Sequence, residues 1–213
     1  MNPVKMSIYI VVRIVSFSAC FIACISMAQA DGDALFGLHW GMSPEEVRNS
    51  GATIEFNSQD RNLFVYKATS LPKNLNDVKF YKLIFDNNQS LVKMGLLLNM
   101  ITDDPAGIDG KDRFIQLEKI LDKKYKKDQQ RSIQSSGNNS YKNIDEFYQC
   151  LAYKGCGLWV SKFEGSNMQI AIWLHGTSRG TGYIELEAES IPEWRETIER
   201  YRNSIAKDEE AAL

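Results

Sequence analysis

Two stretches of the chain alternate between apolar and other side chains, and this period of two limits the folds that the chain can adopt. In "YIELEAES", residues 183–190, three glutamates alternate with Ile184, Leu186 and Ala188. In "LVKMGLLLNM", residues 91–100, every second residue from the valine onward is apolar and large. Because successive side chains of a strand point to opposite faces, each stretch predicts a strand with one face in a core. Such alternation is typical of antiparallel sheets.

Further strands are predicted on both sides of the middle of the chain. Before residues 91–100, "NLFVYKAT" and "FYKLIF" (62–69 and 80–85) are rich in aromatic and β-branched residues, and Asn87-Asn88 suits a hairpin turn. After the middle, we expect strands at about 144–151, 157–164, 167–175 and 182–189.

Two helix starts are predicted by the spacing of serine and glutamate. In "FGLHWGMSPEEVRNSG", residues 36–51, Ser43 and Glu46 have the spacing of a capping box, in which each side chain bonds the other residue's backbone N–H. The same spacing recurs at Ser190 and Glu193. We interpret these four residues as helix caps and not as catalytic groups.

Apolar stripes extend the helix prediction. The last helix should run to about Ile205 and leave residues 208–213 as a disordered tail, and another helix is expected over about 110–126, with Asp109 as its cap. The stripe of the last helix consists of Trp194, Ile198, Tyr201 and Ile205.

The predicted order is helix, about three strands, helix, about four strands, helix. This order predicts the α+β class, with antiparallel sheet packed against helices in one domain, residues 31–207. The halves 31–127 and 141–207 are candidates for a divergent tandem repeat of one helix-plus-sheet unit. Between them, residues 129–140 are polar and predict an exposed loop or linker.

The N-terminal stretch has the three parts of a secretory signal peptide. Lys5 and Arg13 supply positive charge, residues 14–27 are apolar or small, and Ala28-Gln29-Ala30 fits an A-x-A cleavage site. The apolar run is shorter than the roughly 20 residues that a transmembrane helix needs. The pattern therefore favours a cleaved signal over a membrane anchor.

We expect residues 1–30 to be removed at the Ala30-Asp31 bond and the protein to be periplasmic or secreted. The alternative is a lipoprotein anchored to a membrane at Cys24. Cleavage changes the formal net charge from -2 to -4. A mildly acidic domain lacks the basic surface that nucleic-acid binding requires.

The exported chain keeps two cysteines, Cys150 and Cys156, in "YQCLAYKGCGLWV". In an oxidising compartment they predict a disulfide, which we expect to join the ends of a hairpin formed by the strands at 144–151 and 157–164. Zinc sites usually have four ligands, and the two cysteines with the distant His39 and His175 do not form such a set, so neither a metal nor a cofactor is predicted.

The segment "WGMSPEEVRNSGA" resembles the helix-opening motif of small envelope domains. Gly41, Met42, Ser43, Val47 and Gly51 carry the likeness to the SmpA/OmlA assembly lipoproteins and the β-lactamase-inhibitor-like domains. The resemblance implies a helix packed on an antiparallel sheet and a protein that binds other proteins without catalysis.

Five residues are candidates for a partner-binding surface. If Ile170 and Ile172 face the core, the other faces of two neighbouring strands carry Trp173, His175, Tyr183, Glu185 and Glu187. An aromatic patch beside acids on an open sheet is typical of a protein-binding surface, unless a helix covers it.

The sequence therefore predicts a non-catalytic binding protein of the bacterial envelope, of the inhibitor, immunity or assembly-factor type, whose partner is another envelope or secreted protein. One alternative is a periplasmic hydrolase that uses His175 or His39, which would require a carboxylate, serine or cysteine beside the histidine. A second alternative is a small-ligand carrier, which would require a sizeable apolar pocket between sheet and helix.

Overall fold

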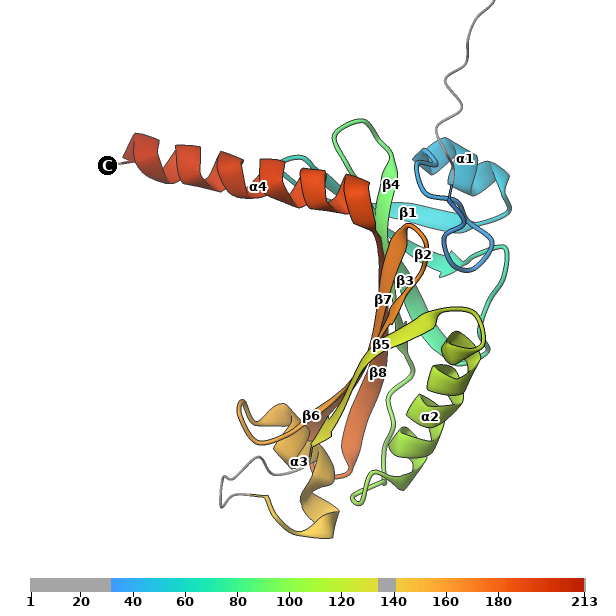
Figure 1. Ribbon diagram of the computed structural model, residues 1–213, viewed down its shortest axis with the longest axis vertical. Helices are drawn as coiled ribbons and strands as arrows, with labels where there is room; N and C mark the ends of the chain where they lie inside the picture. The colour runs from blue at the N-terminus through green and yellow to red at the C-terminus, as the bar shows by residue number, and fades with distance from the viewer. Residues whose placement is uncertain (1–31, 134–140, 213) are drawn as a thin grey trace, which may run out of the picture.

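Eight strands hydrogen-bond into one antiparallel sheet in the computed structural model, which describes residues 32–133 and 141–212 (Figure 1). Their order across the sheet is β1-β2-β3-β4-β8-β7-β6-β5. Their bounds are β1 Thr53–Asp60, β2 Leu63–Ser70, β3 Val78–Phe85, β4 Leu91–Leu98, β5 Lys126–Ile133, β6 Leu158–Glu164, β7 Met168–Ser178 and β8 Thr181–Ser190. The α+β class and the antiparallel sheet are thus confirmed.

The first four strands and the last four are joined at the middle of the sheet. Each group forms consecutive antiparallel pairs, and the last strand of one group, β4, pairs with the last strand of the other, β8. The register of this pair runs from Lys93 opposite Glu189 to Leu97 opposite Glu185. The final strand of the chain therefore lies at the centre of the sheet and not at its edge.

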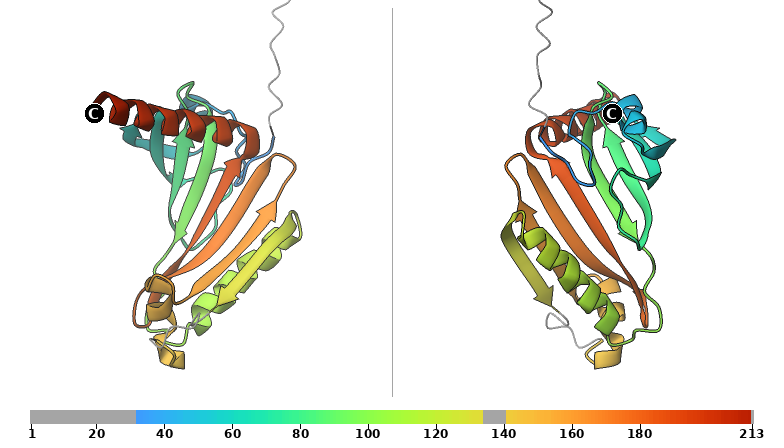
Figure 2. Two further views of the ribbon diagram at one scale, coloured as in Figure 1. Left: turned by 60° about the vertical axis from the view of Figure 1, so that its left-hand side comes forward. Right: turned by 90° about the vertical axis from the view of Figure 1, so that its right-hand side faces the viewer.

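Two helices cover one face of the sheet. Helix α1, Pro44–Asn49, lies over the first group of strands, and α2, Ile108–Asp122, lies over the second (Figures 1 and 2). The alternating apolar residues of the strands face these helices and form the core. Its buried members include Leu83, Met94, Ile172 and Leu186 from the strands, with Val47 from α1 and Phe114 from α2.

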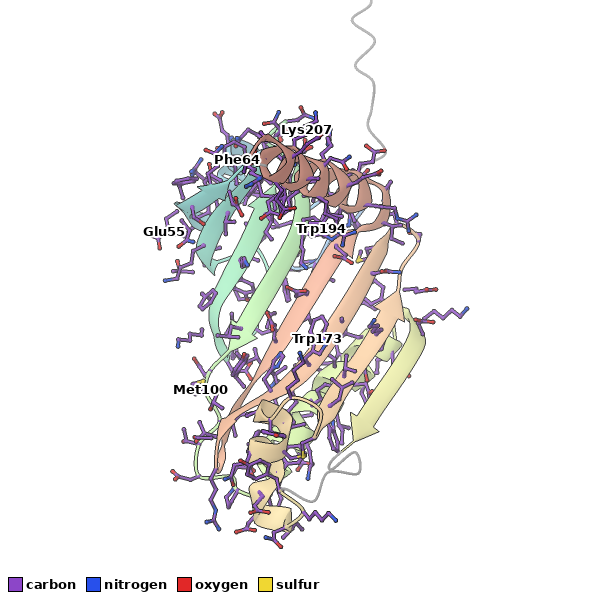
Figure 3. All side chains as sticks on the ribbon, turned by 90° about the vertical axis from the view of Figure 1, so that its left-hand side faces the viewer. Glu55, Phe64, Met100, Trp173, Trp194 and Lys207 are labelled. Atoms are coloured by element: carbon purple, nitrogen blue, oxygen red, sulfur yellow. A yellow bond between two sulfur atoms is a disulfide. The ribbon has the colours of Figure 1, made fainter. Side chains whose placement is uncertain are left out.

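Among the described residues, the other face has helices only at its two ends. Helix α4, Ile191–Ala212, leaves the end of β8 and projects away from the sheet, and the short helices η1, Ile144–Glu146, and α3, Phe147–Ala152, lie at the opposite end (Figure 1). Between these ends, no helix of the described residues lies over the strands (Figure 3).

The first predicted capping box is confirmed. The Glu46 N–H donates to Ser43 Oγ over 3.2 Å, and the Ser43 N–H donates to Glu46 Oε2 over 2.7 Å. The second box is not formed in the part of the chain that the structure describes. Ser190 ends β8, and its hydroxyl donates to the Val92 carbonyl instead, where it joins two strands.

The predicted strand at 144–151 is wrong, because these residues form η1 and α3. Phe147 and Tyr148 are adjacent in sequence and both fully buried, which a half-buried strand does not allow. The Cys150–Cys156 disulfide is present, with Cα atoms 5.1 Å apart. It ties the last turn of α3 to the loop before β6 and does not join two strands of a hairpin, as we had expected.

Both edge strands were missed, so the expected order of elements is also wrong. The observed order is α1, four strands, α2, one strand, η1 and α3, three strands, α4. Strand β1 is almost entirely exposed and alternates only at Ile54 and Phe56, and β5 reads "KKDQQRSI", which has no apolar alternation. Polar residues are common on edge strands, where they discourage pairing with other chains. The rest of the predicted linker, 134–140, lies outside the described residues.

Two helix boundaries also differ from the predictions. Helix α4 continues through residues 208–212, which we expected to be disordered. At the start of α2, the cap is not Asp109: Asp104 accepts hydrogen bonds from the backbone N–H groups of Ile108 and Gly110. The predicted signal peptide and Cys24 lie outside the described residues. Within those residues, no helix combines the length and the apolar character that crossing a bilayer requires.

Candidate binding face

The sheet face opposite α1 and α2 is the candidate functional site, and we call it the open face. Cross-strand register defines its residues, since directly opposed residues of an antiparallel pair share a face. One row crosses the whole sheet from β1 to β5 through opposed residues. From β1 to β6 it consists of Glu55, Lys67, Lys82, Gly95, Glu187, Ala171 and Lys162.

All five residues predicted for partner binding lie on β7 and β8, and their side chains share the open face. Trp173 is opposite Glu185, and His175 is opposite Tyr183. The rings of His175 and Tyr183 stack at 4.8 Å between centroids, and those of Trp173 and His175 at 6.5 Å. Figure 3 shows Trp173 near the middle of this face. The structure thus brings the predicted residues together and leaves each partly exposed.

A hydrogen bond fixes the histidine of this group. His175 Nε2 lies 3.0 Å from Glu185 Oε2. This bond lowers the pKa of the Glu185 carboxyl, because it stabilises the charged form. The pair holds the imidazole in place between Trp173 and Tyr183.

A second group of charges lies beside the first and was not predicted. Lys93 Nζ is 2.8 Å from Glu187 Oε2 and 3.7 Å from Glu189 Oε2. It also lies 5.0 Å from the ring centroid of Trp194, in the first turns of α4. Burial raises the pKa of Glu189, and the neighbouring Glu187 adds to this effect. The alternation of "LVKMGLLLNM" placed Lys93 on the outer face, but nothing in the sequence indicated that β4 pairs with β8.

Two hollows flank Glu187 on this face, one on each side. The first hollow has a volume of about 300 Å³ and lies over Ala171, between Trp173, Glu189 and Lys162. The second hollow has a volume of about 180 Å³ and lies over Gly95. A Cβ atom on Gly95 would stand 3.3 Å from the Leu186 carbonyl oxygen, so the close packing of β4 on β8 favours glycine there. Small side chains at both positions leave the two depressions.

The structure supports the arrangement of a hydrolase only in part. Each histidine contacts a carboxylate, as that hypothesis requires: His175 contacts Glu185, and His39 Nδ1 lies 3.1 Å from Asp33 Oδ1. In the described ranges, however, neither histidine forms a hydrogen bond to a serine or cysteine side chain. Cys150 and Cys156, the two cysteines of the described residues, are both in the disulfide.

One serine motif is visible in the sequence and was overlooked. Residues 176–180, "GTSRG", have the letters G-x-S-x-G of a hydrolase nucleophile elbow. The elbow requires a sharp turn from a strand into a helix. Here Ser178 ends β7, is opposite Thr181, and is followed by β8. The hairpin therefore lacks the context that exposes a nucleophile at a helix start.

The structure gives less support to a small-ligand carrier and to a metal site. Charged side chains line both hollows beside Glu187, whereas a carrier requires an apolar pocket between sheet and helix. Within residues 32–133 and 141–212, no group of three or more His, Cys, Asp or Glu side chains could hold a metal ion.

Comparisons with known proteins give no match to this chain. No protein-family model, no curated protein and no solved structure is similar to it.

Proposed function

We propose that this chain is an exported, non-catalytic domain of the bacterial envelope that binds another envelope or secreted protein through its open face. The observation that carries the proposal is the uncovered face itself, on which aromatic rings and paired charges lie between two flanking helices (Figure 3). Aromatic residues surrounded by polar groups are typical of protein interfaces. The SmpA/OmlA-like and β-lactamase-inhibitor-like resemblance agrees with this proposal and favours an inhibitor, immunity or assembly role.

The topology supports a divergent tandem repeat as the origin of this face. Each group of four strands is preceded or interrupted by its own helices, and each ends in a strand that meets the other at the centre. Two related units joined in this way double the width of the sheet, so the binding face is wider than either unit alone. Cleavage after Ala30, or lipidation at Cys24, would deliver the domain to its partner.

Site-specific crosslinking tests the proposal. A photoreactive benzoylphenylalanine replaces Tyr183 on the open face, and the same group replaces Lys119, which is exposed on α2 at the opposite face. Illumination in cells should give a discrete crosslinked protein from position 183 and not from position 119. The crosslinked protein is then purified and should bind the unmodified chain directly. Absence of any crosslink specific to position 183, or equal crosslinking from both positions, would contradict the proposal.

The contact between His175 and Glu185 favours the hydrolase as the second candidate. A base oriented by a carboxylate is part of many hydrolytic sites. If this pair were catalytic, purified protein should hydrolyse members of an ester and peptide panel, and His175→Gln should abolish the activity. Activity that survives His175→Gln, or no activity, would remove this candidate.

A further inference from the structure

The first hollow contains more acidic than basic side chains. Four carboxylates and two ammonium groups line it. These are Asp128, Glu164, Glu187 and Glu189, with Lys93 and Lys162. The hollow therefore has a formal negative charge, although the open face as a whole mixes both signs.

Lys93 does not neutralise the two carboxylates nearest to it. Its single ammonium is shared between Glu187 and Glu189, at 2.8 and 3.7 Å, and is held beneath the ring of Trp194. The two glutamate side chains are each 31% exposed, so they remain accessible from the hollow. Burial and the neighbouring Glu187 raise the pKa of Glu189, whereas the ammonium groups of Lys93 and Lys162 act to lower it, so burial outweighs the two cations at this carboxyl.

The walls of the hollow suit a planar cation. The methyl group of Ala171 leaves its centre open, and Trp173 provides an aromatic wall next to the carboxylates. A guanidinium group can bond carboxylate oxygens through its fork of N–H groups and can stack on an indole ring. An ammonium group would gain the charge interaction but not the planar stacking.

We propose that the first hollow receives an arginine side chain from the protein partner, with its guanidinium group between Trp173 and the carboxylates of Glu187 and Glu189. This inference rests on the proposed binding function. At about 300 Å³ the hollow is at the lower limit of small-molecule sites, so it suits one side chain better than a free ligand. Arginine is also among the residues that contribute most to protein interfaces.

Titration with short peptides tests the chemistry of the hollow without the partner. The probes are N-acetyl-Gly-Arg-Gly-amide and its citrulline counterpart, which has nearly the same shape and no charge. In ¹⁵N NMR spectra of the whole chain, the arginine peptide should shift the Trp173 indole and Ala171 amide signals. The citrulline peptide should bind at least about tenfold more weakly, because it lacks the charge-assisted hydrogen bonds. No shift at these signals, or equal binding of both peptides, would overturn the inference.

Two variants and a matched control locate the site. Glu189→Gln should weaken the arginine peptide by about tenfold, the loss of one charged hydrogen bond. Ala171→Leu should fill the hollow and abolish the shifts, with no change of charge. Glu55→Gln removes the same charge from β1 on the same face, far across the sheet, and should leave binding unchanged. Equal losses in Glu189→Gln and Glu55→Gln would reveal only general charge attraction and would refute the site.

The same variants separate this inference from the proposed function. If the crosslink from position 183 persists in both Glu189→Gln and Ala171→Leu, the chain binds a protein but the arginine pocket is wrong. If the crosslink is lost in both variants while the control retains it, the two proposals stand together. If no position gives a specific crosslink but the peptide titration succeeds, the hollow binds a guanidinium group, but the proposed function fails and with it the arginine of a protein partner.

Discussion

The hydroxyl of Tyr148 should contribute measurably to stability, and Tyr148→Phe removes it without changing the shape of the ring. Tyr148 is fully buried on α3, and its Oη donates to Asp104 Oδ2 over 3.0 Å. Asp104 is only 6% exposed and also accepts the N–H groups of Ile108 and Gly110 at the start of α2. The hydroxyl thus links α3 to the cap of α2.

The expected loss follows from the charge of the acceptor. A hydrogen bond to a charged group contributes about 1.5–3 kcal/mol to the free energy of unfolding. In a chain of this size each kcal/mol changes the melting temperature by about 2–4 °C. Tyr148→Phe should therefore lower the melting temperature by about 3–12 °C at neutral pH. The pH dependence gives an independent check, because burial, assisted by Asp104, raises the pKa of Tyr148 far above its ordinary value.

A raised pKa in the folded state contributes stability below the ordinary tyrosine pKa of about 10 and loses it above that value. The difference in stability between wild type and Tyr148→Phe should thus shrink as the pH rises above about 10, by up to about 1.4 kcal/mol per pH unit. Urea unfolding followed by circular dichroism at pH 7 and above pH 10 measures both quantities. Tyr153→Phe is the control, since Tyr153 is 48% exposed on the same segment. A difference below about 0.5 kcal/mol between the two variants at pH 7 would refute the reasoning.

Three further predictions concern other parts of the molecule. Replacing Cys150 and Cys156 by serine should lower the free energy of unfolding by about 2 kcal/mol, the loop-closure entropy of a short disulfide loop; urea unfolding measures it, and an unchanged midpoint would contradict it. Leu186→Ala, in the core between β8 and α2, should cost about 2–5 kcal/mol in the same assay, whereas a loss as small as that of a surface leucine would show that the core lies elsewhere. His175→Gln should raise the pKa of Glu185 toward its ordinary value, because it removes the imidazole, whose hydrogen bond and charge lower that pKa in the wild type. In the wild type, the lowered pKa of Glu185 therefore adds stability that is present above its ordinary pKa near 4.3 and is lost as the pH falls through the lowered pKa. NMR titration of both proteins measures the two pKa values, and equal values would disprove the role of His175.

The sequence predicted the elements whose amphipathic pattern is regular. The strands around Met94, Ile172 and Leu186 alternate between core and open face, so their period of two is visible without a structure. The capping box at Ser43 is equally local, because both of its hydrogen bonds lie within three residues. The grouping of His175 with Glu185 followed from one hairpin and its turn.

Elements whose formation depends on distant partners were not predicted. Strand β5 forms because β6 offers it an edge, not because "KKDQQRSI" has a strand pattern. Helix α3 replaces an expected strand because Phe147 and Tyr148 both find buried surroundings, among them Asp104 far back in the chain. The first hollow depends on β4 lying beside β8, a long-range pairing that local patterns do not encode.

The central pairing of β4 with β8 has a consequence for how the chain folds. Strand β4, residues 91–98, can pair with β8 only after residues 181–190 have been synthesised. Until then, one edge of β4 is unpaired. That strand is the apolar "LVKMGLLL", and an unpaired apolar edge is a template for aggregation. A chain shortened before β8 would therefore retain the first four strands but expose the unpaired edge of β4, at which we expect it to aggregate. We expect the order of synthesis to make β8 both the last strand to form and the one that protects the first half from self-association.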